Sequence, residues 1–305
     1  MPSGTTLAGL CVAKNEADII EAMVRHNLGF LDQLHVVDND SADATQTILA
    51  ALHAEMGARL TWSVDRRAGH GQQAIINEML PDLAARTDAA QMVLLDADEF
   101  VKADAGHFRQ SLLAFDQPVS LPWRTYVPTV QDDAGEPNPL ARITQWRRRE
   151  VPRHSKITVP RDLVGQVQVG AGSHGLVATK WIAGKEIAGL ALAHFPIRSR
   201  EQLMSKVLIG WWNMQLRDNK SRKEGFHWRQ LVTRILCGDP LTDADVQTVA
   251  LSYAAHVAVR LIADPLIAPG AMTLRYTQSN PALLERNLIA FAESCVRQLA
   301  GSSDS

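Results

Sequence analysis

The sequence contains few cysteines, no excess of charge of one sign and no long apolar run. Its three cysteines, Cys11, Cys237 and Cys295, are far apart and lack Cys-x-x-Cys spacing, which argues against a disulfide framework and a thiolate zinc site. This cysteine usage is typical of a reducing compartment. The 31 Lys and Arg nearly balance the 33 Asp and Glu, so the net charge of −2 offers no general attraction to nucleic acid.

No stretch approaches the roughly 18 consecutive apolar residues that a membrane-spanning helix needs. The first residues, 1–4, do not resemble the start of a secretory signal peptide. We therefore expect a cytoplasmic protein without a transmembrane segment, for which peripheral contact with a membrane stays open. With 305 residues, 46% of them hydrophobic, the chain is long enough to bury a large core.

Short apolar segments alternate with polar loops and amphipathic helices in the first hundred residues. The predicted strands are 7–12, 34–37, 60–64 and 92–95. The predicted helices are 19–28, a helix carrying Ile48, Leu49 and Leu52 that is capped by Ser41 or Asp43, and 71–86. Such alternation predicts parallel strands joined by helical crossovers.

The pattern changes twice after residue 118. Short β-like segments separated by proline and glycine come first, at 119–123, 143–146, 156–159, 167–169 and 176–181. Predicted helices follow at 200–220, 228–237, 243–262 and 281–299. We therefore expect an α/β fold with a catalytic domain over 1–199 and a C-terminal helical region over 200–305.

Acidic side chains follow three of the predicted strands. Asp38 and Asp40 come after the second, Asp65 after the third, and Asp96, Asp98 and Glu99 after the fourth. The loops at the carboxyl ends of parallel strands converge on ligands. Nearby carboxylates repel one another unless a cation compensates, and oxygen ligands suit Mg²⁺ or Mn²⁺, which take further ligands from substrate phosphates. The pattern predicts a divalent metal and a nucleoside diphosphate.

The spacing of Asp96 and Asp98 allows both carboxylates to face one site, because residues two apart in an extended chain point to the same side. One carboxylate would bind the metal while the other reaches the ribose or a metal-bound water. The alternative is a solvated turn at the end of a strand, in which an aspartate caps the next helix.

Three segments in this order resemble family-two glycosyltransferases of the GT-A fold. They are Cys11–Glu16 (CVAKNE), Val36–Asp43 (VVDNDSAD) and Leu94–Phe100 (LLDADEF). A weaker similarity to a bacterial subgroup covers Trp123-Arg124, His154–Lys156, Gly172–His174 and His194–Ser199. The resemblance implies a Rossmann-like, mostly parallel sheet flanked by helices. It also implies transfer of a hexose-like sugar from a nucleoside diphosphate-sugar, expected to be a UDP-sugar, to a glycan or other hydroxyl acceptor, as in polysaccharide biosynthesis.

The same resemblance implies roles for individual residues. The donor-binding residues would be Ala13, Lys14, Asn15, Glu16, Asp38, Asp40 and Asp65. Asp96 would lie near the ribose and the metal, and Asp98 would be the principal metal ligand. A downstream histidine often completes the metal site of such enzymes, and His174 and His194 are the candidates. We favour His174, which lies in a glycine-flanked loop, although either histidine could be purely structural.

A diphosphate leaving group also requires positive charge. Lys156, at the end of a basic segment, and Arg198, in a second one, are our candidates. Arg67 follows the third strand and would either reach the donor or pair with a neighbouring acid. Trp123 is a candidate platform for a sugar or a packing residue.

The general base of an inverting reaction is not identified by the sequence. Asp133 and His174 are candidates, but the acidic residues Asp132, Asp133, Glu136 and Glu150 do not match the family pattern convincingly, so the stereochemical course stays open. Nucleotidyl transfer is an alternative function, although the loop 13–18 lacks the glycines typical of it. A third alternative is a protein that keeps the fold and binds carbohydrate but has no catalytic activity.

Overall fold

The structure is a computed structural model that describes residues 5–67, 71–133, 135–215, 226–239, 241–253, 259–277 and 282–301. The first elements are β1 (Thr6–Ala13), α1 (Ile20–Asn27), β2 (Gln33–Asp38), α2 (Thr45–Met56), the 3-10 turn η1 (Gly57–Arg59), β3 (Leu60–Val64), α3 (Gln72–Arg86), β4 (Ala89–Asp96), β5 (Glu99–Lys102), α4 (Ala105–Ala114), β6 (Val119–Thr125) and α5 (Pro139–Arg142). Next come β7 (Gln145–Arg147), β8 (Ser155–Pro160), η2 (Arg161–Leu163), β9 (Gln168–Val169), η3 (Ala171–Ser173), β10 (Leu176–Val177), β11 (Trp181–Ile182), β12 (Lys185–Glu186) and β13 (Ala191–His194). The last are α6 (Arg200–Gln215), α7 (Phe226–Leu236), α8 (Asp243–Ser252), β14 (Leu261–Ala263) and α9 (Ala282–Gly301).

A large, mostly parallel sheet forms the centre of the molecule. Among the described residues it has nine strands in the order β3-β2-β1-β4-β8-β6-β13-β5, with β12 beside β6. β1 pairs in parallel with β2 and β4, and β2 with β3, whereas β8 is antiparallel to both β4 and β6. This architecture confirms the expected α/β fold with a GT-A, Rossmann-like sheet.

The register of the parallel strands aligns their carboxyl ends. Ala13 lies beside Asp38, Asp38 lies beside Val64, and Val12 lies beside Asp96. The polar loops that follow β1, β2, β3 and β4 therefore leave the sheet at one edge, as the sequence predicts.

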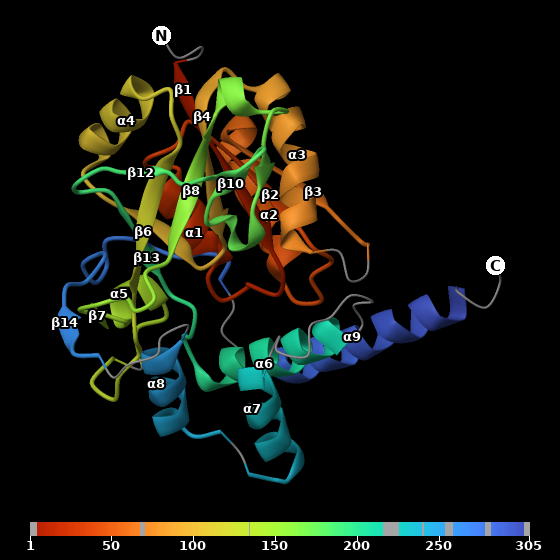
Figure 1. The fold of residues 1–305 in the computed structure, drawn as a ribbon. Coiled ribbons are helices and arrows are strands. Elements are labelled where there is room, and N and C mark those ends of the chain that lie inside the picture. Colours follow the sequence, from red (N-terminus) through yellow and green to blue (C-terminus); the bar gives the residue numbers. More distant parts are fainter. Residues whose placement is uncertain are drawn as a thin grey trace.

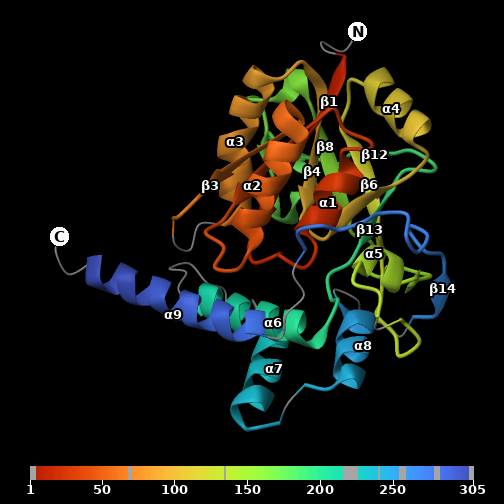
Figure 2. The same ribbon diagram turned by 180° about the vertical axis from the view of Figure 1, so that it is seen from behind.

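Both faces of the sheet are covered. Leu7 and Cys11 of β1 pack into a core with α1, α2 and α4 on the face seen in Figure 2. Ala8 and Leu10, which alternate with them, pack into a second core with α3 and the small sheet β11-β10-β9 on the face seen in Figure 1. Burial of each large apolar side chain contributes about 1.5–3 kcal/mol, so the continuous apolar strands stabilise both layers at once.

The C-terminal helices form a third core at the carboxyl edge of the sheet. Leu203 and Val207 of α6 and Val232 of α7 pack there with Val127 and Ile197 from the preceding part of the chain. Figure 1 shows α6 and α9 side by side below the carboxyl ends of β1 and β4. No helix within the described ranges is long and apolar enough to cross a membrane.

Four local expectations are wrong. The predicted helix 243–262 ends at Ser252, and Leu261–Ala263 instead forms β14, which pairs with β7; residues 254–258 lie outside the described ranges. The segment 176–181 is a hairpin of β10 and β11 rather than one strand. Helix α4 was not predicted, and α2 begins after Ala44 without a side-chain cap. The expected helix 200–220 is confirmed to Gln215, beyond which its residues are not described.

Candidate active site

The loops after β1 and β2 are joined into one unit. Lys14 Nζ donates to the carbonyl oxygen of Asn39 at 2.6 Å, and Asn15 N donates to Ser41 Oγ at 2.8 Å. Asn15 and Asp40 adopt φ values of 57° and 54°, in the left-handed region that short polar residues tolerate best among residues other than glycine. Burial lowers the pKa of Lys14. These contacts hold the predicted donor-binding loop against the end of β2.

Asp38 carries an unused acceptor inside this unit. Its Oδ2 accepts from Ser41 N at 2.9 Å and from Gln46 Nε2 at 2.8 Å. Its Oδ1 is buried and has no hydrogen-bond partner in the described part of the chain. Burial raises the pKa of this carboxyl group. Because an unsatisfied buried acceptor is costly, Oδ1 is suited to accept a hydrogen bond from a bound ligand.

Asp65 is held next to Asp38 and is paired with an arginine. Asp65 N donates to the Asp38 carbonyl oxygen at 2.8 Å. The half-exposed Arg67 binds Asp65 Oδ2 at 2.5 Å and Glu78 Oε2 at 2.7 Å through Nη2, and both partners raise its pKa. Arg67 therefore pairs with neighbouring acids in this structure.

Asp96 is held by a buried lysine. Lys156 Nζ lies 2.7 Å from Asp96 Oδ1, which also accepts a hydrogen bond from Gln72 Nε2. Asp96 N donates to Glu99 Oε2 at 2.8 Å. Burial raises the pKa of Glu99 well above its usual value. Burial lowers the pKa of Lys156, but Asp96 and Glu99 raise it by more.

Asp98 meets a different set of partners. Its Oδ2 lies 3.2 Å from Lys206 Nζ and 4.0 Å from Arg198 Nη1, and its Oδ1 lies 3.7 Å from His194 Nε2. Burial raises the pKa of Asp98, but Lys206, His194 and Arg198 together hold it well below the usual range. Asp98 is therefore a carboxylate at neutral pH, and it does not share its partners with Asp96.

Arg198 links the loop after β1 to the segment after β13. Its Nε and Nη2 bind Asp18 at 2.7 and 2.8 Å, Nη2 also binds Glu16 at 2.6 Å, and Nη1 donates to the carbonyl oxygen of Phe195 at 3.0 Å. Burial raises the pKa of Glu16 to about 7, against the opposing charge of Arg198. The predicted donor residues Glu16 and Arg198 are thus bound to each other.

Trp123 lies among three histidines. Its ring stacks on His194 with 4.0 Å between the centroids, and it contacts His154 and His174 at 5.2 and 5.5 Å. Its Nε1 donates to Glu99 Oε1 at 2.6 Å. Because Trp123 is buried, its contacts here are those of a packing residue. Burial lowers the pKa of His194 to about 3, so this imidazole is neutral.

The two candidate histidines occupy different sides of Trp123. His194 contacts Asp98, whereas His174 Nδ1 lies 2.7 Å from the carbonyl oxygen of Ser155. Since a carbonyl oxygen only accepts, Nδ1 of His174 is the nitrogen that donates to it, and Nε2 is the ring nitrogen left for another partner. A Cβ at Gly172 would lie 2.6 Å from this Nε2, so the glycine lets the loop close over the ring.

Asp133 lies in the exposed loop between β6 and α5. Its Oδ1 accepts from Gly135 N at 2.9 Å. No hydrogen bond or ion pair among the described residues joins Asp133 to Asp96 or Asp98. Of the two candidate bases, His174 is the one connected to the acidic motif. Its ring contacts Trp123, and Trp123 Nε1 donates a hydrogen bond to Glu99.

Few side chains are placed to bind a metal ion together. Among the described residues no three His, Cys, Asp or Glu side chains are grouped to hold a metal ion. Asp98 Oδ1 and His194 Nε2, however, are 3.7 Å apart. Neighbouring ligands on an octahedral Mg²⁺ with bonds of about 2.1 Å are separated by about 3.0 Å, so the two atoms would have to move closer to share one ion. Mg²⁺ is commonly held by one or two carboxylates beside water and phosphate, and the carboxylate of Asp98 fits that chemistry.

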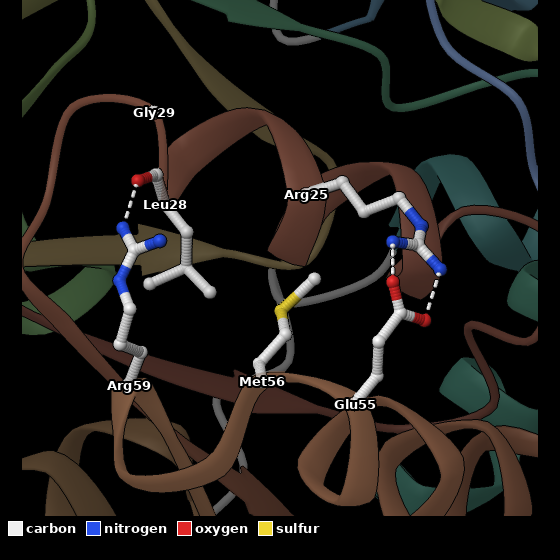
Figure 3. Close-up of a pocket in the computed structure, with 6 residues that line it drawn as sticks. All are labelled: Arg25, Leu28, Gly29, Glu55, Met56 and Arg59. Atoms are coloured by element: carbon white, nitrogen blue, oxygen red, sulfur yellow. Dashed lines mark hydrogen bonds and ion pairs between the residues drawn. The ribbon is translucent and has the colours of Figure 1, made fainter.

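A pocket away from the candidate site lies between α1 and α2. This pocket of about 500 Å³ is lined by Arg25, Leu28, Gly29, Glu55, Met56 and Arg59. Figure 3 shows that both arginines are engaged: Arg25 binds Glu55 with two hydrogen bonds of 2.8 Å, and Arg59 donates to the carbonyl oxygen of Leu28. None of the predicted site residues lines it.

Sequence reasoning did not select Lys206 or Glu99 for the site. Glu99 follows Asp98 directly within the acidic motif, and this position was the only sequence feature that pointed to it. Lys206 is one of several cations after His194, and nothing local distinguishes it from Arg200. The position of α6 under the sheet brings Lys206 to Asp98.

No protein-family model matches the chain, and a comparison with curated proteins found no match either. Several solved structures match part of the chain, with TM-scores below 0.5. One is residues 1–349 of S. aureus TarS in complex with UDP, with 12% identity, coverage of 76% of this chain and 70% of that chain, and a TM-score of 0.39. Another is the mannosyltransferase PcManGT from Pyrobaculum calidifontis in complex with GDP-Man and Mn²⁺, with 14% identity, coverage of 82% and 74%, and a TM-score of 0.41. A mycobacterial protein has 20% identity, coverage of 54% and 56%, and a TM-score of 0.32.

Proposed function

We propose that this chain is a metal-dependent glycosyltransferase that moves a hexose-like sugar from a nucleoside diphosphate-sugar to a hydroxyl acceptor. The observation that carries the proposal is the group at the carboxyl edge of the sheet. There the buried carboxylate of Asp98 faces the neutral His194, on the same edge as the unpartnered Oδ1 of Asp38. This edge offers an acceptor for a nucleoside and an oxygen and nitrogen pair for a cation.

The nucleoside end of the donor is proposed to bind over the joined loops. Asp38 Oδ1 would accept from the base or the ribose. The other residues proposed to line this part are Ala13, Lys14, Asn15, Glu16, Asp40, Asp65 and Arg67. The contacts of Lys14 and Asn15 with the β2 loop support this, because they fix the backbone around Asp38 before a ligand arrives.

The diphosphate end is proposed to bind at Asp98. Asp98 and His194 would hold Mn²⁺ or Mg²⁺, and Asp96 would lie towards the ribose. Lys156 holds Asp96, and Arg198 holds the loop after β1, so both cations position the site. When bound, the metal would neutralise charge that develops on the departing diphosphate. His174 remains a second candidate for the metal.

We propose His174 as the general base and keep Asp133 as the alternative. With Nδ1–H held by the Ser155 carbonyl oxygen, Nε2 of His174 is free to take the proton from an acceptor hydroxyl. The acceptor itself is proposed to be a glycan or glycoconjugate in a polysaccharide-forming reaction. The proposed catalytic domain covers 1–199 and the helical region 200–305. From the cysteine usage of the sequence we propose the cytoplasm as the location.

The test is donor hydrolysis. The protein is incubated with a panel of UDP- and GDP-sugars, with Mn²⁺ or with EDTA, and the released nucleoside diphosphate is measured. We expect slow, Mn²⁺-dependent release with one donor, accelerated by hydroxyl acceptors. Release of pyrophosphate from a nucleoside triphosphate and a sugar phosphate would establish nucleotidyl transfer instead. If the protein neither binds nor turns over any donor, the interpretation that remains is a non-catalytic carbohydrate-binding protein with this fold.

A further inference from the structure

We propose that Lys206, on α6 of the C-terminal helical region, is the protein cation that contacts the diphosphate of the donor. The inference rests on the proposed function, because it concerns the donor of the same site. It follows from comparing the three cations that surround the acidic motif: Arg198, Lys156 and Lys206.

Arg198 is closed off from a ligand by its burial and its carboxylate partners, although one of its five N–H donors, on Nη1, has no recorded hydrogen bond. Its side chain is 0% exposed, and its Nε, Nη1 and Nη2 already bind Asp18, Glu16 and the carbonyl oxygen of Phe195. Moving this guanidinium to a phosphate would leave two carboxylates without their partner, which is costly. Arg198 is therefore a structural cation.

Lys156 is equally enclosed. Its side chain is 1% exposed, and its Nζ lies 2.7 Å from Asp96 Oδ1 and 3.8 Å from Glu99 Oε2. An incoming phosphate would have to replace Asp96 at a position that solvent hardly reaches. Lys156 therefore sets the position of Asp96 and not that of the diphosphate.

Lys206 differs from both in access. Its side chain is 25% exposed. An ammonium group has three N–H donors, and the acceptors recorded for Lys206 Nζ are Asp98 Oδ2 at 3.2 Å and the carbonyl oxygen of Pro196 at 3.0 Å. The described contacts of Nζ also include the ring of Tyr253, whose centroid is 5.3 Å away. One donor is thus left for a ligand.

The two oxygens of Asp98 place this donor beside the proposed cation. Oδ2 faces Lys206, whereas Oδ1 faces His194. A diphosphate bound to a cation at Oδ1 therefore lies next to the carboxylate that Lys206 also contacts. The flexible stem of a lysine allows its ammonium to follow a phosphate oxygen without leaving this neighbourhood.

The backbone of Lys206 is fixed by packing. Leu203 and Val207, on either side of it in α6, are fully buried in the third core. The third core also contains Val127 and Ile197 from the preceding part of the chain. The C-terminal helices therefore hold Lys206 at the site, and the donor site is complete only when they are present.

The experiment compares binding of nucleoside diphosphates and monophosphates. Affinities of UDP, UMP, GDP and GMP are measured by calorimetry for the full chain, with EDTA and with Mn²⁺, in the wild type, K206M and K206R. We expect K206M to weaken diphosphate binding at least tenfold in both conditions and monophosphate binding less than twofold. K206R should stay within about threefold of the wild type. K185M is the matched control, because Lys185 is an exposed lysine on β12 that packs over Phe115, and it should change nothing.

Three results would overturn the inference. Unchanged diphosphate affinity in K206M would remove Lys206 from the donor site while leaving the proposed function intact. An equal loss for diphosphate and monophosphate would show a structural role. Absence of nucleotide binding by the wild type would overturn the proposed function as well. If K206M does not fold, acetylation of wild-type lysines read by mass spectrometry decides: UDP must protect Lys206 more than UMP does, and equal labelling refutes the proposal.

Discussion

Glu21 Oε2 accepts a hydrogen bond from Thr277 N at 2.7 Å, which ties α1 to a segment 256 residues further along the chain. The same oxygen accepts from Tyr276 N at 2.7 Å, and Oε1 accepts from Arg275 N at 2.8 Å and from Arg25 Nε at 2.9 Å. Burial raises the pKa of Glu21, but these hydrogen bonds lower it by more. Residues 275–277 are thereby anchored on α1.

We expect E21A to destabilise the protein by about 3 kcal/mol, because it leaves three part-buried backbone N–H groups without their acceptor and removes one of the two carboxylates that bind Arg25. Urea unfolding measures the loss, and limited proteolysis should show earlier cleavage near residues 275–277. E55A is the control: it removes the other, more exposed partner of Arg25 and should cost far less. Equal losses for the two variants would contradict the anchoring role of Glu21.

The buried His35 predicts a stability that depends on pH. Burial lowers the pKa of its imidazole to about 4, and its ring contacts Thr61 Oγ1 at 2.8 Å and Ser63 Oγ at 3.1 Å. Since the folded pKa is below the unfolded value of about 6.5, the stabilisation is present above pH 6.5 and is lost as the pH falls towards 4.

For this histidine alone the loss between pH 7.5 and 5.0 is about 2 kcal/mol. Thermal unfolding of the wild type and H35Q at both pH values tests it. H35Q should show a smaller decline than the wild type over this range. Parallel declines would show that His35 does not titrate as its burial requires.

If Asp98 is a metal ligand, its substitution should change how the affinity for nucleotide depends on metal. Because D98N removes the charge that faces His194, we expect Mn²⁺ no longer to strengthen binding of a nucleoside diphosphate, whereas it should do so at least tenfold in the wild type. Calorimetry with Mn²⁺ and with EDTA gives the ratio. D133N, at the exposed Asp133, should keep the metal effect. A metal effect that survives in D98N would show that Asp98 is not the ligand.

Substitution of Asp38 should affect nucleotide binding in a different way from substitution of Lys206, because it should not distinguish diphosphates from monophosphates. Since its free Oδ1 is proposed to bind the nucleoside, D38A should weaken nucleoside monophosphates and diphosphates by the same factor, about tenfold for one charge-assisted hydrogen bond. The same calorimetric series measures both ligands. D82A, which removes an exposed carboxylate paired with Arg86, serves as the control. Unchanged monophosphate binding in D38A would exclude Asp38 from the nucleoside site.

If His174 is the general base, its substitution should lower the rate of sugar transfer without changing the affinity for the donor. We expect H174Q to lower kcat for sugar transfer by at least about a hundredfold, because it removes a general base, and to leave the Kd of the nucleoside diphosphate unchanged. H107Q provides the control, since His107 binds the carbonyl oxygen of Ala188 on the exposed side of α4. Loss of donor binding in H174Q would support its role as a metal ligand instead.

Much of the fold could be predicted where the signal is local. The apolar runs 7–12 and 92–95 identified two central strands, because β1 and β4 are buried on both faces. Helix 71–86 was predicted as part of the alternation of strands and helices and is confirmed as α3. The segment 261–263 was not, because its pairing with β7 depends on a partner far away in the sequence, and its apolar residues suit a helix or a strand equally.

The sequence by itself determined that acidic residues stand at the ends of adjacent parallel strands, because strand burial and side-chain alternation are local properties. It did not determine which cation each carboxylate meets. Lys156 on β8 binds Asp96, whereas Lys206 on α6 and His194 on β13 face Asp98. Only the tertiary structure decided these pairings, since charge interactions depend on separations of a few ångströms and the partners arrive from three distant elements.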